Sequence, residues 1–136
     1  MKQASRYWTG AHTKHRMLYH IVWIPKYRKR VLQGEIAKRI NELLFECADV
    51  NGWHIEELNV QPDHVHMLVQ LRPDTSVSEV VNRFKGKSSY LIRKEFSQFK
   101  EFFWWKKTDS FWGEGFFVET VGQISEEKIR EYIQNQ

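Results

Sequence analysis

The chain has 136 residues, 41% of them hydrophobic, which suits one domain (1–136) with a sizeable core and argues against disorder. Its formal net charge is +4 and its isoelectric point is about 9.2, a moderately basic balance that fits a nucleic-acid partner without demanding one. The single cysteine, Cys47, excludes a disulfide framework and a cysteine-based zinc site. No apolar run reaches the ~18–20 residues of a membrane span and no signal peptide is visible, so we expect a cytoplasmic protein.

Residues 1–14 form a polar, basic segment around two neighbouring aromatic residues. One interpretation is a frayed chain terminus. The other is a flexible arm that lies along single-stranded nucleic acid, with its cations on phosphates and its rings under bases. The second interpretation makes Lys2, Arg6 and Lys14 candidate DNA-binding residues.

The segment His15–Ile24 predicts the first strand, and because both of its faces are largely apolar we expect a central strand that is covered on both sides. Pro25 ends this strand. The next residues, 26–30, hold four cations and one aromatic ring. Such a run is often a solvated loop, but its position directly after a buried strand favours a loop that faces an anion. The candidate DNA-binding residues in this loop are Lys26, Arg28 and Arg30.

Apolar residues recur at helical spacing over Gly34–Val50, which predicts an amphipathic helix that packs on the sheet. Cys47 lies on its apolar face and is interpreted as a packing residue. Gly52 suits the left-handed position at which a helix ends. The second strand is expected at Trp53–Gln61, and a turn at Pro62-Asp63 joins it to the next strand as an antiparallel hairpin.

The third strand carries the most informative pattern in the chain, because its side chains alternate between two faces. One face holds Val65, Met67, Val69 and Leu71, and the other holds His64, His66, Leu68 and Gln70. Two imidazoles side by side on a rigid strand are a preformed pair of nitrogen ligands for a divalent metal. Histidines in strands are mostly structural or surface residues, so this motif alone is a weak signal, and a third ligand must come from elsewhere.

A long helix is expected to begin at Ser76, which forms a capping box with Glu79. Its cations Arg83, Lys85 and Lys87 lie off the apolar stripe. A charge run on a helix is usually solvated, but this excess has one sign and favours a surface that faces phosphates, so these cations are further candidate DNA-binding residues. Gly86 interrupts good helix formers, which either a close approach of ligand to backbone or tight packing on the sheet would explain.

The segment 98–107 is rich in aromatic residues and its structure is not predicted. A strand is expected at Phe111–Val121, with two glycines that permit a turn or bulge, and a last helix at 124–136. This order predicts an α+β fold, a ferredoxin-like or RRM-like antiparallel sheet with helices packed on one face and a C-terminal helix. The face that bears the histidines must then meet DNA, a partner or the last helix.

Five segments in order give the chain a resemblance to the IS200/IS605 family of single-tyrosine transposases, in the HUH (His-hydrophobic-His) superfamily. The resemblance runs from His20 to Gln136. The segments that carry it are HIVWIPKYR (His20–Arg28), LNVQPDHVH (Leu58–His66), FKGKSS (Phe84–Ser89), FWGEGFFVETVG (Phe111–Gly122) and YIQNQ (Tyr132–Gln136).

The resemblance implies a role for each matching residue. His64 and His66 match the metal-ligating histidines, Tyr132 on the catalytic helix matches the nucleophile, and Gln136 matches the third ligand. The metal is Mg²⁺ or Mn²⁺. The substrate is single-stranded DNA with hairpins at transposon ends, which is cleaved and rejoined through a 5′-phosphotyrosine link. The family acts as a homodimer in which the tyrosine helix can serve the partner's histidines.

Family members often continue beyond the position of Gln136, where this sequence ends. If the chain is truncated here, the terminal turn would fray and the new carboxylate would compete for the metal.

Three other interpretations stay open. The first is a domesticated HUH protein that acts on repeated extragenic hairpins with the same chemistry. The second is a non-catalytic module that binds single-stranded nucleic acid on a ferredoxin-like sheet. The third, a zinc hydrolase, lacks an obvious carboxylate ligand and general base.

Overall fold

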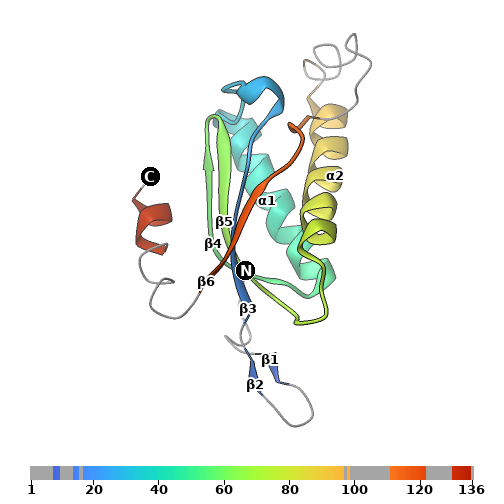
Figure 1. Cartoon of the computed structure of the whole chain (residues 1–136). Helices are drawn as coiled ribbons and strands as arrows, with labels where there is room; N and C mark the ends of the chain where they lie inside the picture. Colours follow the sequence, from blue (N-terminus) through green and yellow to red (C-terminus); the bar gives the residue numbers. More distant parts are fainter. Residues whose placement is uncertain are drawn as a thin grey trace.

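The computed structural model describes residues 8–9, 14–15, 17–96, 98, 111–121 and 130–135 (Figure 1). Its main sheet is antiparallel, with the strand order β4-β5-β3-β6. These strands are β3 (Met17–Trp23), β4 (His54–Gln61), β5 (His64–Leu71) and β6 (Phe117–Val121). The helices α1 (Gly34–Asn51) and α2 (Val77–Glu95) cover one face of this sheet. This order is the ferredoxin-like arrangement, and it confirms the predicted fold class.

Two short strands precede the main sheet. The strands β1 (Trp8–Thr9) and β2 (Lys14–His15) pair in antiparallel fashion, so part of the predicted arm is paired backbone. Lys14 lies in β2 by its backbone, whereas Lys2 and Arg6 lie outside the described residues, as does most of the aromatic segment 98–107. Within the described ranges, no helix has the length and apolarity needed to cross a membrane.

The sheet separates two apolar cores. On the helix-covered face, Val65, Met67 and Val69 of β5 are completely buried against α1 and α2. On the opposite face, which we call the histidine face, a small cluster forms from Leu18, Leu68, Val121 and Ile133. The alternation predicted for β5 is therefore confirmed, and β3 is covered on both sides as expected.

The ends of the helices follow the predicted local chemistry. The Ser76 side chain accepts a hydrogen bond from the Glu79 backbone N–H at 3.4 Å and caps α2. Gly52 closes α1 with a φ of 77°, and its N–H donates to the carbonyls of Ala48 and Asp49. Cys47 is buried in the core between the helices and the sheet, as a packing residue should be.

The last strand is shorter than predicted, because β6 begins at Phe117 and not at Phe111. Consecutive residues of a strand point to opposite faces, yet Phe111 and Trp112 are both buried in the helix-side core. Their backbone is held by hydrogen bonds from Lys26 N to Phe111 O (3.0 Å) and from Gly113 N to Ile24 O (2.9 Å). Residues 111–116 are therefore an anchored loop.

Gly86 does not pack tightly on the sheet. A Cβ atom built at this position would meet nothing within 4 Å, so that explanation for the glycine is wrong. Gly86 lines a pocket of about 280 Å³ between the two helices, together with Arg83 and Lys87 of α2. The close approach of a ligand stays a prediction.

Candidate active site

The two histidines of β5 lie side by side on the histidine face. The ring centroids of His64 and His66 are 4.4 Å apart, and the ring planes meet at 81°. His66 is buried, with 7% of its surface exposed, and the side chain of His64 is 19% exposed. The strand thus holds both imidazoles at the position that the sequence pattern predicts. We call these two residues the histidine pair.

A carboxylate orients the first imidazole. The Nδ1 atom of His64 lies 2.8 Å from Asp63 Oδ1, and Asp63 Oδ2 accepts a hydrogen bond from Arg28 Nε at 3.0 Å. An ionised carboxylate only accepts, so Nδ1 carries the proton and the Nε2 lone pair of a neutral His64 is free. The hydrogen bond from His64, and after it the Arg28 charge, holds the pKa of Asp63 below its usual range.

The Nε2 atom of His64 is buried, and it has no hydrogen-bond partner among the described residues. Buried polar atoms almost always have a partner, so an orphan of this kind calls for an explanation. A divalent cation satisfies such a lone pair as a hydrogen-bond donor would, and the residues present therefore fit a metal.

The second imidazole is kept neutral. Burial, reinforced by the neighbouring His64 and His20, lowers the pKa of His66 to about 4. Its Nδ1 atom lies 3.2 Å from His20 Nε2, and His20 Nδ1 lies 2.9 Å from Glu119 Oε2. Both histidines of the pair are therefore held through Nδ1, one directly by a carboxylate and the other through a third imidazole.

A helical turn at the chain's C-terminus docks on the histidine face. We call residues 130–134 the terminal turn. Asn59 of β4 donates from Nδ2 to the Ile133 carbonyl at 2.7 Å, and Ile133 is almost completely buried. Arg130 forms two ion pairs, one between Nη1 and Glu57 Oε2 at 2.9 Å and one between Nη2 and Glu56 Oε1 at 3.3 Å. These contacts attach the end of the chain to strand β4.

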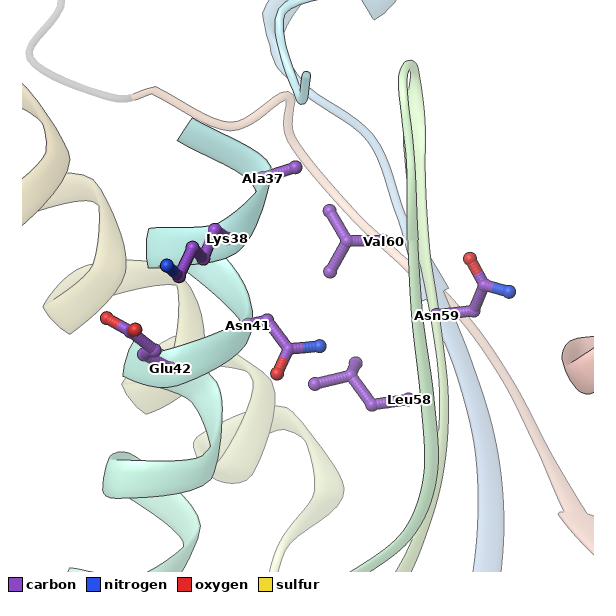
Figure 2. Close-up of a pocket in the computed structure, with 7 residues that line it drawn as sticks. All are labelled: Ala37, Lys38, Asn41, Glu42, Leu58, Asn59 and Val60. Carbon is purple, nitrogen blue, oxygen red and sulfur yellow. The ribbon is translucent and has the colours of Figure 1, made fainter. Parts of the chain in front are cut away.

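The alternation of β4 explains why Asn59 can reach the terminal turn. In Figure 2, Leu58 and Val60 point toward α1, whereas Asn59 points away from that helix. The residues drawn there line a pocket of about 570 Å³ between α1 and β4. This pocket opens on the helix side of the sheet, so it is separate from the histidine pair.

Tyr132 stands beside the histidine pair of its own chain. Its ring centroid is 5.4 Å from that of His66, with the planes at 76°. The side chain is not enclosed, because 55% of its surface is exposed. The fold thus brings the phenol of Tyr132 next to the imidazole of His66. Gln136 lies outside the described residues.

The basic loop after β3 lies next to the site. Lys26–Arg28 forms a short 3₁₀ helix (η1), in which Tyr27 and Arg28 have φ values of 61° and 53°. This left-handed region is costly for residues other than glycine. The Arg28 bond to Asp63 ties the loop to His64, and Arg30 is exposed. Three predicted DNA-binding residues are therefore gathered at one end of the sheet.

The cations of α2 lie elsewhere. Arg83 and Lys87 are exposed on a helix that covers the opposite face of the sheet, and Arg83 also bonds Glu79 and Asn51. Lys85 Nζ donates to the carbonyls of Gly113 and Gly115 at 2.7 and 2.9 Å. An ammonium has three donors, so at most one is left for a phosphate. The structure does not bring these cations to the histidine pair.

Sequence reasoning missed His20 and Glu119. The period-two pattern of the first strand placed His20 on the face opposite Ile21 and Trp23, which was the available signal. The contact itself depends on strand register, since His20 pairs with Glu119 across β3 and β6 and with Leu68 across β3 and β5. That register is a tertiary property, which periodicity within one strand does not contain.

Two solved structures with a similar fold come from proteins described as transposases. A crystal structure of a Deinococcus radiodurans R1 protein assigned as a transposase has a TM-score of 0.76 and 30% identity, and the match covers 94% of this chain and 96% of that one. The structure of a REP-associated tyrosine transposase bound to a REP hairpin has a TM-score of 0.63 and 14% identity, over 98% of this chain and 70% of that one. The fold and the site thus point to a transposase.

Sequence relatives define the family. The chain is 36% identical over 126 residues to the transposase for insertion sequence element IS200 of Salmonella typhimurium, covering 93% of this chain and 80% of the relative. It is 32% identical over 118 residues to the ISDra2 transposase TnpA of Deinococcus radiodurans, covering 87% and 82%. The family model described as "Transposase IS200 like" matches residues 13–136. The chain belongs to the family of IS200-like transposases, and this membership implies an enzyme that cleaves and rejoins DNA.

Proposed function

We propose that this transposase cuts and rejoins single-stranded DNA at hairpin-bearing transposon ends through a covalent 5′-phosphotyrosine intermediate on Tyr132, assisted by a divalent metal. The observation that carries the proposal is the position of Tyr132 beside the histidine pair, in which His66 is buried and His64 presents a buried Nε2 atom with no partner among the described residues.

Cutting and rejoining without a nucleotide cofactor requires a covalent intermediate that conserves the energy of the cleaved phosphodiester bond. The Tyr132 oxygen attacks the scissile phosphorus and loses its proton, the phosphorus–O3′ bond breaks, and the departing strand takes up a proton as a 3′-OH. A 3′-OH of a second strand then attacks the phosphotyrosine and releases Tyr132. The number of phosphodiester bonds is conserved, so no nucleotide cofactor is required.

The proposed metal ligands are His64, His66 and Gln136. The side-chain oxygen of Gln136 is the third ligand that the family resemblance assigns, and that residue lies outside the described ones. Within the described residues, no group of three His, Cys, Asp or Glu side chains is arranged to hold a metal. Mg²⁺ or Mn²⁺ bound here would neutralise the charge that builds on the phosphate and on the departing oxygen.

The chain's own residues prepare the site for this ion. All three proposed ligands are neutral, and the low pKa of His66 keeps its imidazole unprotonated at neutral pH. The ion would therefore keep its full charge for the DNA. Two nitrogen ligands are a poor match for Mg²⁺, which prefers oxygen, so we expect weak metal binding without DNA and better occupancy with Mn²⁺.

Two observations support the proposed DNA partner. The basic loop beside His64 offers Lys26, Arg28 and Arg30 to a phosphate backbone. A transposase with the same fold has been solved bound to a REP hairpin. We infer that hairpin-bearing single strands bind this chain as well.

The experiment is a covalent-adduct assay on hairpin-bearing single strands with Mn²⁺, read by denaturing gel. Tyr132→Phe should abolish the adduct and leave hairpin binding nearly intact. Tyr90→Phe is the matched control, because Tyr90 is similarly exposed, at 58%, on the helix-covered side. An adduct that survives in Tyr132→Phe would show that the nucleophile is misassigned. Hairpin binding without any adduct in the natural protein would favour the non-catalytic module.

We also propose a homodimer in which the terminal turn can serve either subunit. Support comes from β4, which forms one edge of the described sheet and could pair with a second copy. Movement of the turn would then switch the site on, since it carries Tyr132 to and from the histidines. Mixing His64→Ala with Tyr132→Phe subunits tests this arrangement. Recovered cleavage supports a composite site, whereas heterodimers without cleavage favour a site within one chain.

A further inference from the structure

Three side chains from three strands form a hydrogen-bonded line on the histidine face. Glu119 of β6 lies directly opposite His20 of β3 in the strand register, and His66 of β5 is the diagonal neighbour of His20. Glu119 Oε2 lies 2.9 Å from His20 Nδ1, and His20 Nε2 lies 3.2 Å from His66 Nδ1. The two imidazoles are nearly parallel, at 11°, with centroids 5.5 Å apart. The line is thus built by strand pairing.

The line has a direction, set by its carboxylate end. An ionised Glu119 can only accept, so His20 donates from Nδ1. A neutral His20 then has a lone pair on Nε2, which accepts the proton of His66 Nδ1. A neutral His66 with its proton on Nδ1 has its lone pair on Nε2. Each residue therefore determines which nitrogen of the next one carries the proton.

We propose that Glu119 and His20 are positioning residues for the metal site, which hold His66 as the tautomer that offers Nε2 to the divalent cation. This inference rests on the proposed function. Glu119 would orient His66 as Asp63 orients His64. The contact from Glu119 runs through His20 because β3, which carries His20, lies between the strands of Glu119 and His66. Partners of this kind fix the ring and raise the basicity of the ligating nitrogen.

The opposite protonation makes the inference falsifiable. If His20 carried two protons, both of its nitrogens would donate and His66 Nδ1 would have to accept. The proton of a neutral His66 would then sit on Nε2 and block that nitrogen as a ligand. The tautomer of His66 in the metal-free protein thus distinguishes the two arrangements directly.

The first experiment is NMR on metal-free protein with ¹⁵N-labelled histidine, which reports the protonated nitrogen of each imidazole. We expect His66 to carry its proton on Nδ1 in the natural protein. Glu119→Ala should leave a mixture of the two His66 tautomers, and Glu119→Gln should restore most of the original signal because its amide oxygen still accepts. A proton on Nε2 of His66 in the natural protein, or no change in Glu119→Ala, would overturn the inference.

The second experiment is Mn²⁺ titration calorimetry with the same variants. Glu119→Ala should weaken Mn²⁺ binding by about 10-fold or more, within the range that loss of such partners causes in other metal sites. Glu114→Ala is the matched control, since it removes one exposed carboxylate near β6 and should change the affinity less than 2-fold. Equal affinities for the two variants would overturn the inference.

The two proposals can fail separately. If the natural protein forms the tyrosine adduct and binds Mn²⁺ with an affinity that Glu119→Ala does not change, the positioning role is wrong and the proposed function stands. If it binds no Mn²⁺ and forms no adduct, both proposals fall, and the NMR measurement still shows whether the hydrogen-bonded line sets the tautomer.

Discussion

The anchored loop 111–116 depends on a hydrogen bond that one substitution can remove. The Oγ atom of Ser88 on α2 donates to the Phe84 carbonyl at 2.7 Å and accepts from the Trp112 indole N–H at 2.8 Å. Ser88 and Trp112 are both about 1% exposed. Ser88→Ala therefore leaves a buried donor without its acceptor, in a place where water cannot replace it.

The expected magnitude follows from this geometry. An unsatisfied buried donor costs about 1–3 kcal/mol, and the better helix propensity of alanine returns about 0.5 kcal/mol. We expect the free energy of unfolding to fall by about 0.5–2.5 kcal/mol. With a urea m-value of about 2 kcal/mol/M, the midpoint should shift down by about 0.3–1.2 M without a change in m.

Urea unfolding followed by tryptophan fluorescence measures this shift. Ser78→Ala is the control, because Ser78 is exposed on the same helix and its replacement should change stability by less than about 0.5 kcal/mol. In a Trp112→Phe background the donor is absent, and Ser88→Ala should then cost much less. An equal cost in both backgrounds would refute the argument, since it would show that the Trp112 bond contributes nothing.

Three further predictions follow from the site and its surroundings. Asp63→Ala should weaken Mn²⁺ binding about 10- to 100-fold in calorimetry, because the imidazole of His64 loses its orienting acceptor; unchanged affinity would contradict that role. The pKa of His66 is about 4 in the folded protein and 6.5 in an unperturbed histidine. Between pH 4 and pH 6.5 the unfolded chain therefore binds more protons than the folded chain. Stability measured by urea unfolding should be full above pH 6.5 and fall toward pH 4, and His66→Asn should flatten this dependence. Lys85→Met should cost about 1–3 kcal/mol because it loses two contacts to backbone carbonyls, whereas Lys87→Met should cost under about 0.5 kcal/mol because Lys87 is exposed. Equal stabilities of the two variants would argue against the Lys85 contacts.

Local patterns predicted those parts of the fold that local physics controls. The alternation of β5 placed the histidine pair on the face away from α1 and α2, because side-chain direction in a strand has a period of two. The cap at Ser76 and the left-handed Gly52 followed from the chemistry of the residues themselves. In each case the residues that interact are close together in the chain.

Contacts between distant segments were beyond reach of the same reasoning. The fit of His20 between Glu119 and His66 requires the register of three strands. The prediction for residues 111–116 was wrong because Phe111 and Trp112 have the composition of strand residues. The hydrogen bonds that hold this segment as a loop come from Ile24, Lys26 and Ser88 of α2, which are distant in the sequence.

The attachment of Tyr132 was equally hidden. It depends on contacts such as Asn59 with Ile133, which join residues 74 positions apart. A family resemblance pointed to the tyrosine, but only the folded chain shows what holds it in place.

The modest attachment of the terminal turn limits how long Tyr132 stays beside His66. Burial of Ile133 contributes about 1.5–3 kcal/mol, the Asn59 bond about 1 kcal/mol, and the pairs of Arg130 at most about 1 kcal/mol each. Ordering the five residues of the turn costs about 1–2 kcal/mol each, which is as large as this gain or larger. We therefore expect a docked nucleophile in equilibrium with a detached one, exchanging within microseconds to milliseconds, so that a few residues of polar contact govern how often the phenol is presented to a phosphate.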